Sequence, residues 1–348
     1  MQEPLPALTD LYLGTFHLVV LPDAFLGGCA PHLRTFILHG VAFPAFPRFV
    51  LRATHIVSLS LFDLPNSGYS SLSPEAMVNC LAALPDLETF EIEFRSPPPS
   101  PLQTTPPPRM RSVLPALTSI YFRGASEYLE GLISLIDAPH LNELSIEFFV
   151  DLIFDIPQLH EFIGRTRRLR PLNPAQLKFS GDGIRIRISL GSSPTRLKLE
   201  IICEEPGWQL SSVAQVCNAH FPLLSQVEQL DICETSPMKL AAKNEVNPSQ
   251  WLELFRPFSA VRSLYVSETL EPIVAGALRE LSGDRTMEVL PALENLSLDE
   301  LGPSGPARDA MEPFIAVRQL SGRSVVVQRQ KRRLEPKTGT PYASEDEV

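Results

Sequence analysis

The sequence predicts an α/β fold built from repeated strand–helix units. The first observation is an apolar motif in which three leucine-type residues are separated by two variable residues and then by one. Its nine copies begin at Leu8, Leu33, Ile56, Leu87, Leu117, Leu141, Val227, Val261 and Leu293. These starting residues lie 25, 23, 31, 30 and 24 residues apart, then 86, then 34 and 32. A short apolar motif recurring at such intervals, roughly 20–29 residues in regular cases, is typical of a leucine-rich-repeat solenoid.

The second observation is the alternation of apolar and polar residues, followed by helix signals. Alternation is the strand period, so the second and third apolar residues of each motif should face inward and their neighbours outward. Ser73-Pro74-Glu75 predicts a helix start, Ser126 is expected to cap a helix over 128–136, and Asn247-Pro248 opens another. Further helices are expected over 212–219, 272–281 and 309–320. A single compact α/β domain is the alternative, but it would not need nine copies of one motif.

The third observation is that the repeats are irregular. Three residues past the last apolar residue, regular repeats carry Asn or Cys, and that side chain ties successive turns together. Here the position holds Phe16, Val41, Leu64, Arg95, Ala125, Phe149, Thr235, Thr269 and Leu301. Without this ladder and with uneven repeat lengths, we expect an irregular horseshoe.

A hairpin-like insertion is predicted near residues 174–203, inside the 86-residue gap. Ile184, Ile186, Ile188 and Leu190 alternate with polar residues after the turn 180–183, and a second alternating run over 197–201 follows the turn 191–194. Local antiparallel pairing fits this pattern better than two more repeats. The intervening Arg185 and Arg187 form either a basic contact strip or an ordinary solvated strand face.

We therefore divide the chain into a solenoid over 1–321 and a disordered tail over 322–348. A proline-rich loop, 96–109, interrupts the solenoid; its PxxP spacing suits either a polyproline ligand or a solvated insertion. The tail contains the basic stretch 328–333, which is either a nuclear-import patch or part of a soluble end.

The composition of the chain indicates its cellular compartment and the class of partner that it is expected to bind. Five cysteines without a CxxC pair, and no signal peptide at the start, predict reduced thiols in the cytoplasm, the nucleus or both. No apolar run reaches about 18 residues, so no membrane span is expected. The net charge of −10 makes nucleic acid an improbable partner, because neutralising phosphates needs a basic surface.

The sequence offers no constellation for catalysis. His160-Glu161 lacks the second histidine of a zinc-binding HExxH, and GxSxG, GxGxxG and GxxxxGK[ST] are all missing. The hypothesis is a protein that is not an enzyme, with no catalytic residues, no metal and no cofactor.

Several long phrases resemble a large group of fungal F-box/leucine-rich-repeat proteins. They are SGYSSLSPEAMV (67–78), the stretch from SVLPALTSIYF to LHEFIGRT (112–166), WLELFRPFSAVRSLYVSETLEPIVAGALREL (251–281) and VLPALENLSL (289–298). The likeness covers about residues 5–320. It implies a repeat region that recruits the protein to be modified by a cullin-type ubiquitin ligase.

The chain departs from that family at its beginning. An F-box needs about 40–50 residues of helix after an LPxE-like turn, whereas here Leu21-Pro22-Asp23 is followed by Gly27-Gly28 and another repeat. The F-box is not present, so a ligase adaptor is expected as a partner only if an F-box lies upstream. One hypothesis is a substrate-recognition module; the alternative is a scaffold or decoy that binds a protein without ubiquitination.

The outward strand residues are the candidate binding site on the concave face. They combine tyrosines with acids, and tyrosine is enriched at interface hot spots. The set is Tyr12, Glu91, Glu93, Tyr121, Arg123, Glu143, Glu147, Asp231, Tyr265 and Asp299, with Thr35 beside them. We expect a protein partner with a basic contact patch; the alternative is a polar face that is merely solvated.

Overall fold

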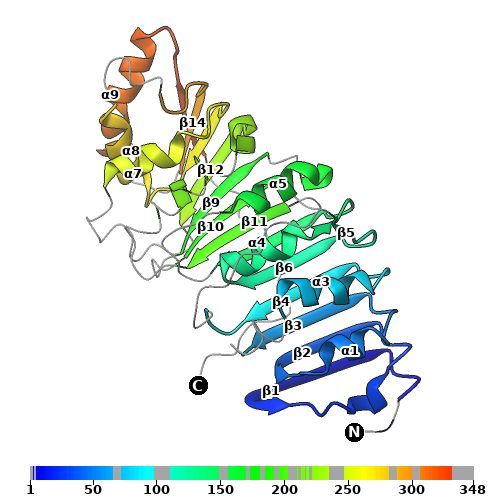
Figure 1. Ribbon diagram of the computed structural model, residues 1–348. Coiled ribbons are helices and arrows are strands. Elements are labelled where there is room, and N and C mark those ends of the chain that lie inside the picture. Colours follow the sequence, from blue (N-terminus) through cyan, green and yellow to red (C-terminus); the bar gives the residue numbers. More distant parts are fainter. Residues whose placement is uncertain are drawn as a thin grey trace.

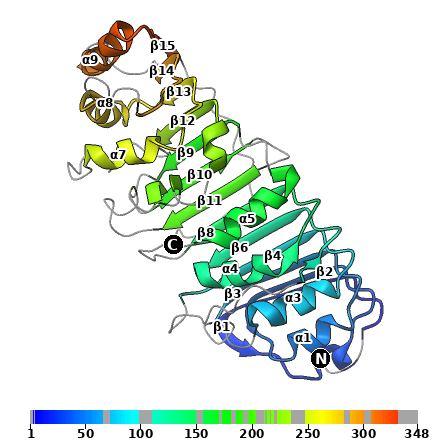
Figure 2. The ribbon, with the colours of Figure 1, turned by 45° about the horizontal axis from the view of Figure 1, so that its top comes forward.

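A computed structural model gives the architecture as one long open sheet with helices along one of its faces (Figures 1 and 2). The structure describes residues 3, 5–65, 72–97, 110–148, 156–169, 173–180, 185–191, 196–202, 210, 213–215, 217–218, 222–234, 247–281, 288–299 and 306–330. The chain therefore has an α/β fold whose sheet is long, open and mostly parallel. Within the described residues, no helix is both long and apolar enough to cross a membrane.

The main sheet has 13 strands. In sheet order they are β1 Asp10–Val20, β2 Thr35–Ala42, β3 Ser58–Leu64, β4 Thr89–Phe94, β6 Ser119–Gly124, β8 Glu143–Phe148, β11 Arg196–Ile202, β10 Arg185–Leu190, β9 Ala175–Phe179, β12 Gln229–Glu234, β13 Ser263–Val266, β14 Asn295–Asp299 and β15 Val326–Gln330. All nine apolar motifs provide strands of this sheet. A second, two-stranded sheet joins β5 Ser112–Val113 to β7 Ile136–Asp137.

The predicted insertion is confirmed, and it is larger than a hairpin. β10 pairs antiparallel with β11, as the two alternating runs predicted, and also antiparallel with β9 on its other side. β11 then pairs parallel with β8, and β9 pairs parallel with β12. Because two reversals restore the direction, the insertion fits into the sheet while its outer neighbours keep the common orientation.

The helices lie on one face of the sheet (Figure 2). The α-helices are α1 Phe46–Val50, α3 Pro74–Ala82, α4 Ser126–Ser134, α5 Pro157–Arg165, α7 Pro248–Phe255, α8 Glu271–Arg279 and α9 Pro306–Leu320, and short 3-10 turns cover Phe25–Gly28, Arg167–Leu169 and Pro222–Gln226. The Ser73 hydroxyl accepts a hydrogen bond from the Ala76 amide at 3.3 Å and caps α3 as predicted. Asn247 caps α7 in the same way, through the Ser249 amide at 3.0 Å. The prediction for Ser126 is wrong, because α4 begins at that residue, with Ala125 at the N-cap position and no side-chain cap.

A repeated backbone hydrogen-bond pattern connects successive units in place of an asparagine ladder. The Thr9 carbonyl accepts from both the Arg34 and Thr35 amides, at 2.7 and 3.0 Å. The same two-donor pattern recurs at the equivalent carbonyls of Arg34, Val57, Glu88, Thr118, Glu228 and Arg262. At the predicted ladder position, Val41, Leu64 and Ala125 are buried apolar residues. The backbone therefore supplies the link between units, which leaves that position free to join the core.

The core is one continuous apolar cluster between the sheet and the helices. Inward motif residues such as Leu144 and Leu264 are fully buried. Aromatic rings fill the layer. Tyr128 of α4 packs against Phe94 and Phe122, with ring centroids at 4.8 and 6.1 Å, and its hydroxyl donates to the Leu72 carbonyl at 2.7 Å. Such a core exists only if neighbouring units stack on one another.

Two reciprocal polar contacts fix α4 against α5. The buried Glu130 carboxylate of α4 accepts from the Gln158 and Leu159 amides, at 2.7 and 2.8 Å, at the first turn of α5. Arg165, at the end of α5, donates to the Ile133 carbonyl at 2.6 Å. α5 has no side-chain cap from its own N-cap residue, so Glu130 of the neighbouring helix satisfies the exposed amides.

The C-terminal edge of the sheet corrects the predicted tail. The prediction of disorder from residue 322 onward is wrong for residues 326–330, because β15 pairs parallel with β14 from Val326 to Gln330. Val325 is buried and Val327 packs against the core. Residues 331–348, with half of the basic stretch 328–333, lie outside the described residues, as does most of the proline-rich loop 96–109.

Candidate functional site

The face of the 13-stranded sheet without helices, here called the open face, carries the outward side chains of every unit. Strand β4 shows how it is built: Phe90 and Ile92 are fully buried beneath the helices, while Glu91 and Glu93 lie half-buried on the other side. Parallel pairing repeats this alternation from strand to strand, so outward residues at one register form rows across the sheet.

The predicted binding residues lie on this face but are spread along it. Tyr12, on the edge strand β1, is 60% exposed, and Glu143 is exposed in the middle of the sheet. The other eight predicted residues with described side chains are half-buried: Thr35, Glu91, Glu93, Tyr121, Arg123, Glu147, Asp231 and Tyr265. Asp299 belongs to β14, and its side chain lies outside the described residues.

Register brings two groups of the predicted residues together. Glu91 is the cross-strand partner of Tyr121, and Arg123 has Glu93 and Glu147 as its two partners. On the far side of the insertion, Asp231 of β12 lies opposite Tyr265 of β13. Three strands, β11, β10 and β9, separate Glu147 on β8 from Asp231 on β12. The predicted set is therefore two clusters, with the insertion between them.

The first cluster is an ionic row across β4, β6 and β8. An Arg123 Nη atom lies 2.6 Å from Glu93 Oε1, and Arg123 Nε lies 3.1 Å from Glu147 Oε1. Burial alone would lower the pKa of Arg123, but Glu147 and Glu93 outweigh it and raise that pKa. The Tyr121 hydroxyl donates to Glu147 at 3.4 Å, and burial, then Glu147 and Glu93, raise the pKa of this phenol.

A second charged group lies on the insertion, and most of it was not predicted. Arg187 of β10 forms an ion pair of 2.7 Å with Glu200 of β11, whose carboxylate is almost fully buried, and Lys198 lies 3.6 Å from the same carboxylate. Lys178 of β9 is the cross-strand partner of Arg187, and half-buried Arg196 completes the group. Burial, and then the nearby charge of Arg187, lower the pKa of Lys198.

The middle of the open face therefore carries two patches of opposite charge. The acidic patch on β4, β6 and β8 consists of Glu91, Glu93, Glu143 and Glu147, with Arg123 among them. The basic patch on β9, β10 and β11 consists of Lys178, Arg187, Arg196 and Lys198, with Glu200 among them. They meet between β8 and β11, where Glu143 and Arg196 are register partners.

The sequence contained part of the signal for the basic patch. The sequence predicts that Arg185 and Arg187 form either a contact strip or a solvated strand face. The side chain of Arg185 lies outside the described residues, whereas Arg187 takes part in the patch. Lys178, Arg196 and Lys198 were missed. Their outward positions follow from alternation, but their neighbours do not, because the antiparallel pairing places β11, the last of the three strands in the chain, beside β8.

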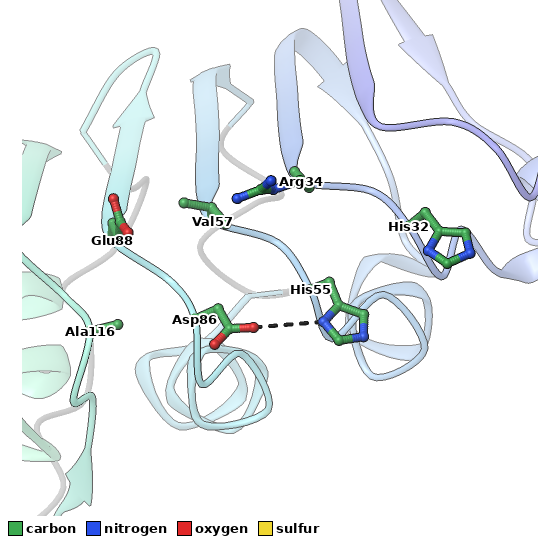
Figure 3. A pocket seen from close by; sticks show the side chains of 7 residues that line it. All are labelled: His32, Arg34, His55, Val57, Asp86, Glu88 and Ala116. Carbon is green, nitrogen blue, oxygen red and sulfur yellow. Dashed lines mark ion pairs between the residues drawn. The ribbon is translucent and has the colours of Figure 1, made fainter.

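A shallow hollow lies where β2, β3 and β4 begin (Figure 3). It is lined by His32, Arg34, His55, Val57, Asp86, Glu88 and Ala116, which come from equivalent positions of four successive units. His55 Nδ1 lies 3.6 Å from Asp86 Oδ2, and both side chains are mostly exposed. The two point toward one another, whereas His32 stands apart (Figure 3). An exposed pair in an open hollow has no desolvated environment to activate it for chemistry.

Two observations on the described part of the chain concern metal ligands and the thiols of Cys80 and Cys217. Among those residues, no group of three or more histidine, cysteine, aspartate or glutamate side chains is placed to hold a metal ion. Burial raises the pKa of Cys80 to about 11 and that of Cys217 to about 12, so both thiols stay protonated near neutral pH. The arrangement on the open face is suited to binding.

No protein-family model matches this chain, and no match was found among curated proteins.

Proposed function

We propose that the chain is an irregular leucine-rich-repeat solenoid that binds a protein partner on its open face. One observation carries the proposal: helices cover one face of a 13-stranded sheet, and the other presents rows of half-buried charged and tyrosine side chains. A polar, rigid sheet of this length is a typical binding surface of repeat proteins. Tyrosine and arginine, here Tyr121 and Arg123, are enriched at binding hot spots.

The resemblance to fungal F-box/leucine-rich-repeat proteins suggests the purpose of that binding. In this proposal the repeats recruit a protein for ubiquitination, in the cytoplasm or the nucleus, and the acidic patch contacts a basic region of it. Exposed Glu143 and the half-buried Glu91 support a basic contact, since complementary charge steers association and sets its register.

Affinity capture with matched variants tests the proposal. The chain is immobilised, partners are captured from a lysate of the source cells, and bound proteins are quantified by mass spectrometry for the wild type and two charge reversals. Glu143→Lys alters the open face, whereas Glu253→Lys alters an exposed residue of α7 on the helical side. We expect Glu143→Lys to lose specific partners and Glu253→Lys to keep them.

The opposite pattern would place binding on the helical side and refute the proposal. Thermal unfolding of both variants serves as the control for folding, since surface substitutions generally change stability by no more than about 0.5 kcal/mol. Ubiquitination of a captured partner by a reconstituted cullin-type ligase then separates substrate recruitment from binding as a scaffold.

A further inference from the structure

The two patches of the open face have opposite charge and lie side by side. Among the side chains that the structure describes, four carboxylates accompany one arginine on β4, β6 and β8, and four cations accompany one carboxylate on β9, β10 and β11. Within each patch the minority charge is already bound: Arg123 to Glu93 and Glu147, and Glu200 to Arg187 and Lys198. The net charges that remain for a ligand are negative on one patch and positive on the other.

The surplus of positive charge has an identifiable origin. Glu200 is 3% exposed and is contacted by two cations, so its single charge is shared. Lys178 lies beside Arg187 across the β9–β10 pair, and Arg196 lies two residues from Lys198 on the same face of β11. Like charges this close repel one another unless an anion lies between them.

We propose that the open face holds an extended protein segment whose acidic side chains contact the basic patch and whose basic side chains contact the acidic patch. This rests on the proposed function and adds the chemistry and order of charge in the partner. A partner that carried only basic residues would leave Lys178, Arg187, Arg196 and Lys198 without an added counter-charge. A nucleic acid would meet repulsion from the acidic patch, because Glu143 is the register partner of Arg196.

The strand spacing fixes the distance between the two charge blocks of the segment. β6 is central to the acidic patch and β10 to the basic patch, and they are three strand spacings apart. At about 4.8 Å per spacing this is about 14 Å, which an extended chain covers in roughly four residues at 3.4 Å each. A segment that crosses the strands should therefore carry its basic and acidic blocks about four residues apart.

Fluorescence anisotropy with synthetic peptides tests the order of charge. The block probe contains three lysines, a glycine and three glutamates; the matched probe has the same composition with lysine and glutamate alternating. A single-stranded oligonucleotide is the third probe, and all three are titrated with the full chain at low salt. We expect the block peptide to bind at least about tenfold more tightly than the alternating one, with binding that weakens as salt increases.

Variants connect the signal to the basic patch. Lys178→Glu combined with Arg196→Glu should lose the preference for the block peptide and gain affinity for a peptide of lysines alone. Arg279→Glu, at an exposed position that ends α8, should behave as the wild type. Circular dichroism and thermal unfolding establish that each variant is folded.

Each outcome has a definite reading. Equal binding of the block and alternating peptides would overturn the proposed order of charge. Tighter binding of the oligonucleotide than of either peptide would show that the basic patch binds nucleic acid and not an acidic protein segment, and would also overturn the proposal. If the two peptides bind equally but Glu143→Lys still loses captured partners, the proposed function (binding of a protein on the open face) is retained and only the proposed order of charge in the partner is rejected. If the preference survives Lys178→Glu and Arg196→Glu, the peptide binds elsewhere and the proposal is wrong.

Discussion

Single residues on one strand report which face of the sheet is buried. Leu144 and Ser145 are neighbours on β8, yet Leu144 is fully buried against the helices and Ser145 lies on the open face. Replacing Leu144 with alanine should cost about 2–5 kcal/mol, as for other large-to-small core changes. Ser145→Ala should change stability by no more than about 0.5 kcal/mol. Urea unfolding measures both, and equal costs would contradict this register.

A surface ion pair gives a residue-scale test by pH. Arg95 donates two hydrogen bonds to Asp63, and these bonds hold the pKa of that carboxyl below its usual range. Because the folded state lowers this pKa, the stabilisation is complete above the ordinary aspartate value of about 3.9 and disappears as pH falls through the folded value. Asp63→Asn should therefore be less stable than the wild type at neutral pH.

The difference between Asp63→Asn and the wild type should shrink as the pH falls below about 3.9. Thermal unfolding across a pH series measures it. Asparagine tolerates the positive φ of 54° at this position, so the comparison reports the lost charge and not backbone strain. A difference that is constant with pH would show that the ion pair contributes nothing.

At the scale of elements, one helix caps the next. The Glu130 carboxylate accepts two amide hydrogen bonds at the start of α5. Glu130→Ala should cost about 1–2 kcal/mol, the usual range for a lost cap. It should also increase hydrogen exchange at the Gln158 and Leu159 amides, which mass spectrometry can follow. Glu130→Gln retains one acceptor oxygen and should cost less. Unchanged exchange in Glu130→Ala would mean that α5 does not depend on this cap.

Most strands could be predicted from the sequence because the alternating apolar residues of each motif have one physical explanation, a strand with one buried face. Residues such as Phe90, Ile92 and Leu264 alternate, are fully buried, and formed strands wherever the motif occurred. Two strands of the 13-stranded sheet were missed for local reasons. β9 has one large aliphatic residue, Leu177, in its alternating pattern, and β15 begins within three consecutive valines, 325–327, which show no alternation. Whether such a segment forms a strand depends on the neighbouring strand with which it pairs, and not on its own pattern of apolar residues.

At the scale of the whole molecule, the candidate site depends on the order of strands in space. Outward positions such as Glu91 and Tyr121 were predictable, because alternation alone decides the face. The contact between the acidic and basic patches was not, since Glu143 and Arg196 are 53 residues apart and meet only because the insertion reverses. The charge of a partner therefore has to be inferred from the assembled sheet.

The edge strand β15 provides a test of how the whole sheet ends. It covers the hydrogen-bonding edge of β14, and Val325 and Val327 close the last layer of the core. Two truncations isolate its contribution: one chain ends at Gly322 and the other at Gln330. The shorter chain should be less stable by about 2 kcal/mol or more, because it loses buried apolar area and exposes a strand edge. Calorimetry of the two chains side by side measures the difference, and hydrogen exchange should rise in residues 295–299 of the shorter chain alone. Equal melting temperatures would show that β14 can terminate the sheet by itself, as the sequence pattern had suggested.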